Sequence, residues 1–464
     1  MLLNVLSVHF VGICGTAMAS AAVAIQDWGY AVTGSDQNVY PPMSTFLAER
    51  KIRVFPQYDE ENLAGRPDLV VIGNSLSRGN PEVEAVLEKK LRYCSLPELL
   101  KEFFIRGKRS LVVTGTHGKT TTTSLLAWVF EHSGLNPSFL IGGIPGNLGQ
   151  GARFTDSDWF IIEGDEYDTA FFDKRSKFLH YLPEVVVINN LEFDHADIFP
   201  NLDAIVVMFR RLISLIPRNG LLLVNGDDPN LAPLLGVNHC PIKRFGLSEA
   251  NEVRAKVKHL HAEHSEFVLD GRLFSIPLTG ELNVRNALAV AACSLHCGLT
   301  HDQIQGAFDT FKGIRRRMEV RGVAGGVTVV DDFGHHPTAV RETVRALRVR
   351  FPGRRLWVVF EPRSNTTRRN VFQGELAGSL GLADLVVVSE IARLELLAPS
   401  ERVDPVKLMN DLHSMGRPAW YLPNVESIAN HVAKEAIGGD VICVFSNGGF
   451  GGIHEKLLER LQSP

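Results

Sequence analysis

The sequence predicts an α/β protein with three domains, each built on a parallel sheet. A chain of 464 residues is too long for one hydrophobic core, which favours several domains. Three successive stretches each begin with a strand-like run, continue into glycine and then show a helical pattern. Because strands that alternate with helices are typical of sheets wound on both faces, we predict Rossmann-like domains at both ends and a central parallel sheet between them.

The composition is that of an ordinary globular protein, with 45% hydrophobic and 22% charged residues. A net charge of -4 gives no electrostatic reason to expect nucleic acid or an anionic membrane as a partner. No apolar run approaches the length that spans a bilayer, and the apolar N-terminus lacks the basic flank of a signal peptide. We therefore expect a cytoplasmic protein without membrane insertion, either a monomer or a weak homo-oligomer.

Cysteine and histidine clusters are the simplest candidates for metal ligands. The six cysteines form no CxxC pair, which indicates buried, reduced thiols. His259, His261 and His264 lie in a polar, charge-rich stretch. A solvated surface is the better interpretation of this stretch than a metal site.

The N-terminal domain is predicted to cover residues 1–107. Apolar runs predict its strands, at 5–11, 30–33 and 68–73. The first strand continues into Gly12-Ile13-Cys14-Gly15-Thr16-Ala17-Met18 and an alanine-rich helix. This run departs from the GxGxxG pattern, yet it is suited to a diphosphate at a helix start, with Asp36 near a ribose. A tight turn without any ligand is an equally good interpretation.

The central domain, predicted at 108–314, contains the strongest local motif. Its predicted strands are 110–114, 159–162, 185–189 and 220–225. The first of them runs into Gly115-Thr116-His117-Gly118-Lys119-Thr120, and a helix is predicted over 121–132. In such a phosphate loop the backbone N–H groups surround phosphate oxygens, while the lysine reaches the β and γ phosphates and the threonine suits Mg²⁺. The full Walker pattern would have glycine at Val113, so a chance match competes with this interpretation.

Two polar segments follow neighbouring apolar strands of the same domain. The acidic run Glu163-Gly164-Asp165-Glu166-Tyr167-Asp168 comes after the strand at 159–162. Asn189-Asn190-Leu191-Glu192-Phe193-Asp194-His195 comes after the strand at 185–189. Carboxylates at a strand end, with a neutral histidine, could complete a hard metal site. A solvated acidic loop and a structural histidine are the competing interpretations.

The third domain, predicted at 315–464, begins at the arginine run 315–317. Its predicted strands are 326–330, 356–360, 385–389 and 441–445. Considered together, the motifs of all three domains resemble the Mur ligase family, the ATP-dependent amide-forming enzymes of peptidoglycan synthesis. The matching elements occur in the family's order: 115–121, Glu163, Glu192-Phe193-Asp194-His195, Gly280-Glu281-Leu282-Asn283-Val284-Arg285-Asn286 and Asp331-Asp332-Phe333-Gly334-His335-His336-Pro337.

The resemblance implies a central P-loop ATPase-type sheet and a role for each matched residue. Phosphates of ATP would meet the loop residues Gly115, Thr116, His117, Gly118, Lys119, Thr120 and Thr121. Adenine would lie near Asn283 and Asn286, and Arg317 and Asp332 would close on ATP. The resemblance implies two Mg²⁺ ions, held by Thr120, Glu163 and His195. The catalytic residues would be Lys119, Glu163 and His195.

Within the family, the N-terminal glycine run resembles the branch that acts directly on UDP-N-acetylmuramate. Its UDP part would face Gly12, Ile13, Cys14, Gly15, Thr16, Ala17, Met18, Asp36 and Ser75. The resemblance implies that ATP converts the lactyl carboxylate into an acyl phosphate, which the amine of a small peptide then attacks. The long segment 169–180 and the run at 361–366 favour L-alanyl-γ-D-glutamyl-meso-diaminopimelate as this peptide, in peptidoglycan recycling. The alternative is the L-alanine-adding activity of de novo synthesis.

A carboxylate-rich peptide needs cationic anchors, and arginine holds a carboxylate by two parallel hydrogen bonds. Arg363 follows the strand at 356–360, so we expect it to project from a strand end toward the substrate. Further peptide-binding residues are predicted on the same and a neighbouring loop: Ser364, Asn365, His335 and His336. Pairing of Arg363 with Glu361 is the competing interpretation, in which case Arg368 or Arg369 would be the anchor.

This chain departs from the family pattern at three places. Leu282 stands where the family has histidine, and Phe333 where it often has tyrosine. The segment 204–216 contains no lysine, so we predict no carbamylated lysine there. Two other classes of function compete with the ligase: an NAD-dependent oxidoreductase, which would leave the phosphate loop without a role, and a non-catalytic nucleotide switch.

Overall fold

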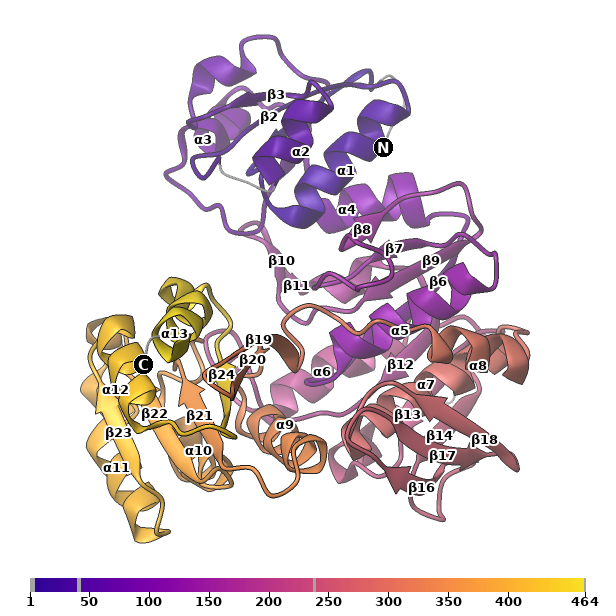
Figure 1. Cartoon of the computed structure of the whole chain (residues 1–464). Coiled ribbons are helices and arrows are strands. Elements are labelled where there is room, and N and C mark those ends of the chain that lie inside the picture. The colour runs from indigo at the N-terminus through magenta and orange to yellow at the C-terminus, as the bar shows by residue number, and fades with distance from the viewer. Residues whose placement is uncertain (1–4, 40–42, 237–238, 463–464) are drawn as a thin grey trace. The chain divides into compact units, whose positions relative to one another are not determined.

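The computed structural model describes residues 5–39, 43–236 and 239–462 of the chain. Their strands form three large sheets of five, eight and six strands, together with a two-stranded and a three-stranded sheet (Figure 1). The chain divides into two compact units. The first comprises residues 1–191, 203–253 and 289–307, and the second comprises 192–202, 254–288 and 308–464.

The five-stranded sheet lies near the N-terminus and is parallel, in the order β3-β2-β1-β4-β5. Its strands are β1 (Ser7–Val11), β2 (Ala31–Ser35), β3 (Arg53–Phe55), β4 (Leu69–Ile72) and β5 (Tyr93–Ser95). Its helices are α1 (Thr16–Asp27), α2 (Met43–Glu49), α3 (Pro81–Glu88) and α4 (Leu96–Leu100), the last followed by a π-helical turn at Lys101–Ile105. The three predicted strands are present, whereas β3 and β5 are too short to leave a clear sequence pattern.

The eight-stranded sheet has the order β15-β14-β13-β12-β6-β9-β7-β8. Its strands are β6 (Arg109–Thr114), β7 (Ser138–Leu140), β8 (Ala152–Arg153), β9 (Trp159–Glu163), β12 (Pro183–Ile188), β13 (Leu221–Asn225), β14 (Ile242–Gly246) and β15 (Val253–Arg254). Helix α5 (Lys119–His132) directly follows β6 and the phosphate loop. The predicted parallel sheet is confirmed, and one edge strand, β8, runs antiparallel to β7.

Further elements lie between or after these strands in the chain. They are the hairpin β10 (Asp168–Ala170) and β11 (Asp173–Ser176), and the helices α6 (Leu202–Ile213), α7 (Glu281–His296) and α8 (His301–Asp309). An antiparallel sheet, which the sequence did not predict, consists of β16 (Lys256–Leu260), β17 (Ser265–Leu269) and β18 (Arg272–Ile276). The charged residues of β16 hide the apolar alternation that normally reveals a strand, because its outer face carries lysine and histidine.

The six-stranded sheet has the order β19-β20-β24-β21-β22-β23. Its strands are β19 (Glu319–Ala324), β20 (Val327–Asp332), β21 (Leu356–Phe360), β22 (Leu385–Ser389), β23 (Ala419–Leu422) and β24 (Val441–Phe445). The other strands pair in parallel as predicted, and the edge strand β19 is antiparallel to β20. Every residue of β21, β22 and β24 is buried, as in parallel strands that are covered on both faces.

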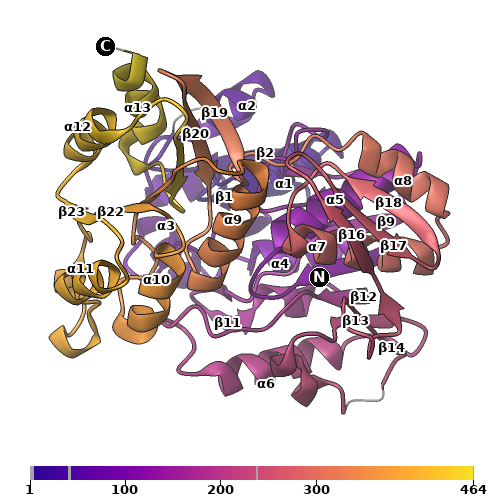
Figure 2. The same ribbon diagram turned by 60° about the horizontal axis from the view of Figure 1, so that its bottom comes forward.

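Five helices cover this sheet in two layers: α9 (Pro337–Arg350), α10 (Gln373–Leu380), α11 (Pro405–Ser414), α12 (Val425–Glu435) and α13 (Ile453–Gln462). One hydrophobic core joins α9, α10 and α11 to one face of the strands, and a second joins α12 and α13 to the other face. Figure 2 shows α10 and α11 separated from α12 and α13 by β22 and β23. The strand ends that carry the predicted peptide-binding loops are therefore held between two packed layers.

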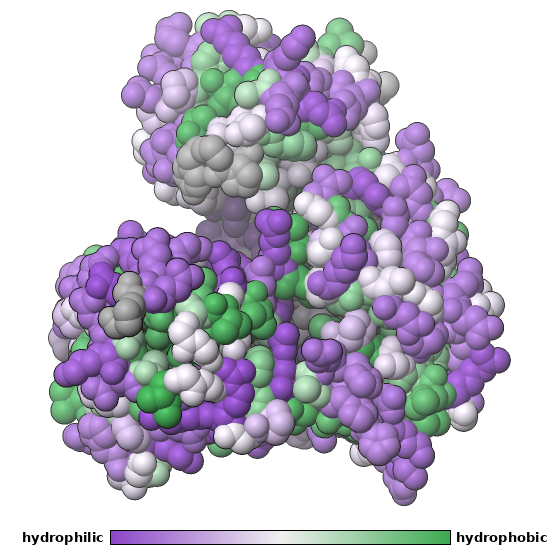
Figure 3. All heavy atoms as spheres, viewed as in Figure 1, coloured by the Kyte–Doolittle hydropathy of each residue, from purple (hydrophilic) through white to green (hydrophobic). Residues whose placement is uncertain are grey.

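The surface agrees with the composition. On the face drawn in Figure 3, hydrophilic residues predominate and hydrophobic residues are interspersed among them. Among the described residues, no helix is both long and apolar enough to cross a membrane.

Candidate active site

The phosphate loop joins the end of β6 to the start of α5, where sequence analysis placed it. Gly115 has φ +122° and Gly118, the N-cap of α5, has φ +78°, both backbone conformations that favour glycine. A side chain at Gly115 would meet the backbone oxygen of Asn190 at 2.8 Å. The Asn190 side chain accepts the His117 N–H at 2.7 Å and donates to the His117 carbonyl at 3.1 Å. The end of β12 therefore fixes the loop, a role for Asn190 that the sequence did not predict.

Lys119 is held on the inner side of this loop. Its Nζ donates to the Gly115 carbonyl at 2.7 Å and to Glu166 Oε1 at 2.9 Å, and the side chain is 15% exposed. Burial by itself would lower the pKa of Lys119, but the facing Glu166 carboxylate outweighs it, so the pKa is raised and the ammonium stays protonated. No role was predicted for Glu166 itself, and its place in the acidic run after β9 is the sequence signal that points to it.

Thr120 and Glu163 lie in contact. Thr120 Oγ1 donates to Glu163 Oε1 at 3.0 Å, and the Gly142 N–H donates to Glu163 Oε2 at 2.7 Å. A Cβ at Gly142 would lie 3.0 Å from Glu163 Oε1, so glycine leaves room for this carboxylate. A hydroxyl and a carboxylate oxygen beside a phosphate loop are the hard oxygen ligands that Mg²⁺ prefers. The donor set therefore fits the predicted ion.

The acidic run after β9 is stabilised by a second lysine. Asp165 forms an ion pair with Lys177 at 2.5 Å and also accepts the Tyr167 N–H at 3.1 Å. Burial by itself would raise the pKa of Asp165, but the opposing effect of Lys177 prevails. The pKa therefore falls below its ordinary value, and the carboxylate is ionised. The run is thus an ordered set of charges rather than a solvated loop.

The glycine run after β1 forms a tight turn at the point where the strand order reverses between β1 and β4. Gly12 has φ +86°, and the N–H groups of Gly12 and Ile13 both donate to the Ser35 carbonyl. Asp36 is buried, accepting the Cys14 N–H at 3.0 Å and the Asn38 N–H at 2.9 Å. Such switch points are where open parallel sheets bind ligands. The UDP contacts predicted for 12–18, Asp36 and Ser75 remain predictions.

In the second unit, the segment after β12 packs on the loops of the six-stranded sheet. Asp194 accepts the Thr366 hydroxyl at 2.8 Å and the His195 N–H at 2.7 Å. Burial would raise the pKa of Asp194, but His195, His335 and His336 outweigh it and lower the pKa below its usual range. His195 itself has φ +56°, a backbone conformation unusual for histidine.

His336 caps helix α9 and also contacts this segment. Its Nδ1 accepts the Thr338 N–H at 3.2 Å, so its Nε2 carries the hydrogen that faces the Phe193 carbonyl at 3.2 Å. The Thr338 hydroxyl donates to Glu192 Oε2 at 2.7 Å. His336 therefore has a structural role as a helix cap. Its role in peptide binding remains a prediction.

Asp332 is the last residue of β20, and Arg317 lies just before β19 in the chain. The Asp332 carboxylate accepts the N–H groups of Met318 and Gly334 at 2.9 and 2.7 Å. Burial raises the pKa of Asp332, an effect that the nearby Arg317 opposes. The Arg317 guanidinium lies 5.2 Å from the Phe333 ring, so the residue that replaces the family's frequent tyrosine makes a cation–π contact.

Asn283 and Asn286 occupy the first turns of α7. Asn283 donates to the Thr279 carbonyl at 2.9 Å, and Asn286 donates to Asn283 Oδ1 at 3.3 Å. Gly280, with φ +101°, turns the chain into this helix. The two side chains are thus fixed to one another, while their predicted place near adenine remains a prediction.

The predicted peptide anchors are brought together after β21. Arg363 is 57% exposed and lies 4.0 Å from Glu361, so this pairing is loose. Ser364 accepts the Thr367 N–H at 3.0 Å, which makes it a turn-forming residue, and Asn365 donates to Asp197 at 2.7 Å. Arg369 is committed to Glu401 at 2.7 Å and is 21% exposed.

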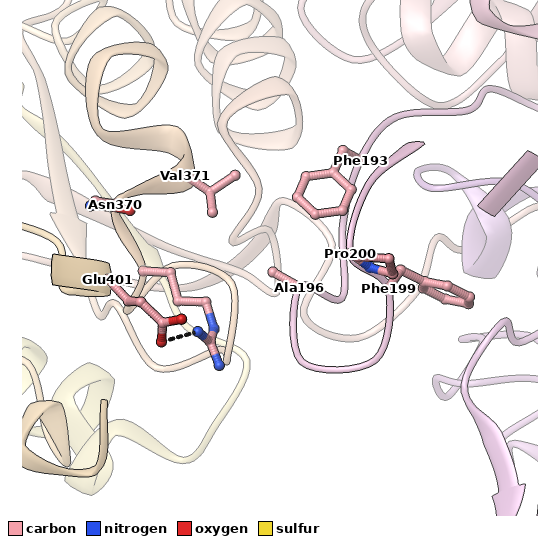
Figure 4. Close-up of a pocket in the computed structure, with 8 residues that line it drawn as sticks. Phe193, Ala196, Phe199, Pro200, Asn370, Val371 and Glu401 are labelled. Carbon is pink, nitrogen blue, oxygen red and sulfur yellow. Dashed lines mark hydrogen bonds and ion pairs between the residues drawn. The ribbon is translucent and has the colours of Figure 1, made fainter. Parts of the chain in front are cut away.

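A cavity of about 370 Å³ lies next to these anchors, within the second unit. Figure 4 shows Phe193 and Val371 on opposite sides of it, with Glu401 in its ion pair at the rim. It is lined by Phe193, Ala196, Phe199, Pro200, Arg369, Asn370, Val371 and Glu401. The lining is a mixture of apolar surface and a few polar groups, as in many sites for small organic ligands.

Comparison with known proteins identifies the class of this chain. Three family models match in order: "Mur ligase family, catalytic domain" at 7–108, "Mur ligase middle domain" at 113–294 and "Mur ligase, glutamate ligase domain" at 316–448. Together with the phosphate loop, they define an ATP-dependent ligase with three α/β domains. The chain belongs to the Mur ligase family.

Two types of relative are found within the family. The chain is 44% identical, over 98% of both chains, to the UDP-N-acetylmuramate–L-alanyl-γ-D-glutamyl-meso-2,6-diaminoheptandioate ligase of Escherichia coli. It is 32% identical, again over 98% of both chains, to a UDP-N-acetylmuramate–L-alanine ligase of Polaromonas. The crystal structure of a murein peptide ligase from Psychrobacter arcticus has 35% identity and a TM-score of 0.74, covering 99% of both chains.

Proposed function

We propose that this protein joins L-alanyl-γ-D-glutamyl-meso-diaminopimelate to the lactyl carboxylate of UDP-N-acetylmuramate in the cytoplasm, with ATP as the energy source. The observation that carries the proposal is the difference in identity: 44% to the tripeptide ligase against 32% to the L-alanine ligase, at equal coverage. The exposed arginine after β21 supports a substrate with several carboxylates.

The residues of the central domain explain how the carboxylate becomes reactive. The lactyl carboxylate attacks the γ-phosphorus of ATP, giving an acyl phosphate and ADP; the peptide amine then attacks the acyl carbon and expels phosphate. The protonated Lys119 neutralises charge on the transferred phosphoryl group, and the loop N–H groups hold the phosphates in line. Mg²⁺ bound at Thr120 and Glu163 would supply further charge neutralisation. Asn190 and Gly115 keep the loop in this form.

The proposal includes a second Mg²⁺ held by Glu163 and His195, motivated by the position of Glu163 at the end of β9 and of His195 in the segment that follows β12. His195→Ala should then raise the Mg²⁺ concentration needed for half-maximal rate, and excess Mg²⁺ should partly restore activity. A folded His195→Ala variant with the parent's Mg²⁺ dependence would remove the second ion from the proposal.

The substrate assignment is tested by ADP release with UDP-N-acetylmuramate and either the tripeptide or free L-alanine. We expect kcat/KM for the tripeptide to exceed that for L-alanine by more than about tenfold, because binding energy from the distal carboxylates is used only with the tripeptide. Product mass distinguishes ligation from uncoupled ATP hydrolysis. A preference for L-alanine would refute the substrate choice but leave the ligase class intact.

Arg363 is the expected anchor for a peptide carboxylate. Arg363→Ala should raise the KM for the tripeptide about ten- to a hundredfold, since a charge-assisted hydrogen bond contributes roughly 1.5–3 kcal/mol. The KM values for ATP and UDP-N-acetylmuramate should change little. Arg369→Ala is the matched control, because Arg369 is already paired with Glu401. If Arg369→Ala raises the tripeptide KM and Arg363→Ala does not, Arg369 is the anchor.

A further inference from the structure

A histidine-rich hairpin lies outside the ligase site. It joins β16 to β17 in the antiparallel sheet of the second unit, and the proposed function gives it no role. His259 pairs with Glu266 across the two strands, and Leu260 pairs with Ser265. Because alternate residues of a strand point to the same face, His261 and His264 are expected on the face that carries His259 and Glu266.

The distances confirm that these side chains converge. Ligand atoms of His261, His264 and Glu266 all lie within 4.8 Å of one another. The rings of His261 and His264 are stacked with centroids 4.3 Å apart, and His264 Nε2 lies 3.7 Å from Glu266 Oε1. The ring of His259 is 5.5 Å from that of His261. The histidines are exposed or partly exposed, as expected from the sequence, and they form a cluster with a carboxylate.

The backbone that carries this cluster is fixed at several points. The His261 N–H donates to the His264 carbonyl at 2.9 Å and closes the turn. The Thr279 hydroxyl lies 3.0 and 2.8 Å from the carbonyl oxygens of His261 and Ala262, and the Ser265 hydroxyl donates to the Leu278 carbonyl at 2.8 Å. On the inner face, Phe267 packs on Phe274. A turn held in this way loses little conformational freedom when its side chains close on an ion.

The chemistry of the cluster selects the type of ion. Imidazole nitrogens with one carboxylate suit Zn²⁺, Cu²⁺ and Ni²⁺, whereas Mg²⁺ and Ca²⁺ prefer oxygen ligands. To form bonds of about 2.0–2.2 Å to one ion, His261 and His264 must rotate out of their stacked arrangement, which is feasible because both side chains are at the surface. We propose that His261, His264 and Glu266 bind a single Zn²⁺ ion, with His259 as the neighbouring fourth ligand.

The proposal is tested with the whole chain, produced without a histidine tag. Competition with a zinc-sensitive dye, in millimolar Mg²⁺ to occupy hard oxygen sites, measures stoichiometry and affinity. We expect one Zn²⁺ per chain that is lost in His261→Ala/His264→Ala. Single substitutions of either histidine should weaken binding at least about tenfold. Co²⁺ should give a visible absorption band of a nitrogen-ligated site in the parent and not in the double variant.

The controls separate this site from zinc bound elsewhere, for example at partly exposed cysteines. Lys258→Ala changes an exposed residue of the same strand that offers no ligand in the cluster, and it should bind Zn²⁺ like the parent. ADP release in Mg²⁺ alone should be equal in the parent and the double variant, which shows that the latter is folded. If the double variant binds Zn²⁺ as the parent does, or if the parent binds none at micromolar concentration, the proposal is wrong.

Discussion

Replacing Lys119 by alanine should lower kcat by about 10²-fold or more, the typical effect of removing one contact to a charge that develops in the transition state. The lysine is held by the Gly115 carbonyl and by Glu166, so its ammonium is already directed into the phosphate loop. The KM for ATP should rise less than kcat falls, because several loop N–H groups still bind the phosphates. Single-turnover measurement of acyl-phosphate formation is the most direct readout.

The controls for Lys119→Ala must separate loss of catalysis from loss of the ion pair between Lys119 and Glu166. The Glu166 side chain is 5% exposed, so loss of Lys119 leaves a buried carboxylate without its cationic partner and costs stability. Lys119→Ala/Glu166→Gln removes that charge and keeps the fold. Lys174→Ala, an exposed lysine of the same domain paired with Asp168, should leave kcat unchanged. Near-parent turnover by the folded double variant would remove Lys119 from the mechanism.

The largest stability effect is expected at Glu82, a fully buried carboxylate in the N-terminal sheet region. It accepts the Ser35 hydroxyl at 2.6 Å and an N–H of Asn62, and it lies 3.3 Å from His9 Nε2. Glu82→Ala removes this acceptor from the buried Ser35 hydroxyl and the buried His9 ring, whereas Asn62 is only partly buried and also donates to the Gln57 carbonyl. We expect the free energy of unfolding of this region to fall by about 3–5 kcal/mol, as when one partner of a buried pair is removed.

Because a three-domain chain does not unfold in one step, the effect is best measured locally. Hydrogen exchange of peptides that cover β1 and β2 should become much faster in Glu82→Ala, while peptides from the six-stranded sheet keep their protection. Glu84→Ala, on the same helix, removes a surface ion pair with Arg78 and should leave exchange unchanged. Unchanged protection of β1 and β2 in Glu82→Ala would show that other polar groups satisfy these donors.

The sequence by itself determined the features that depend on local patterns. Strands β21, β22 and β24 were predicted with their observed bounds because parallel strands covered on both faces are continuous apolar runs. The phosphate loop was also predicted from a local pattern, because its glycines, lysine and threonine are neighbours in the chain and act together. The family resemblance, confirmed by the comparisons, then gave the activity class.

Only the tertiary structure decided contacts between residues that are distant in the chain. Asp194 meets Thr366 across 172 positions, and Lys119 meets Glu166 across 47, and no local periodicity reports such pairs. His261, His264 and Glu266 lie at the surface, as expected, but their convergence could not be read from the sequence, because they meet through strand pairing rather than through spacing on one element. Backbone geometry imposes local periodic patterns on the sequence. Contacts across the fold depend instead on how whole helices and strands pack together, and no short stretch of a single sequence records that packing.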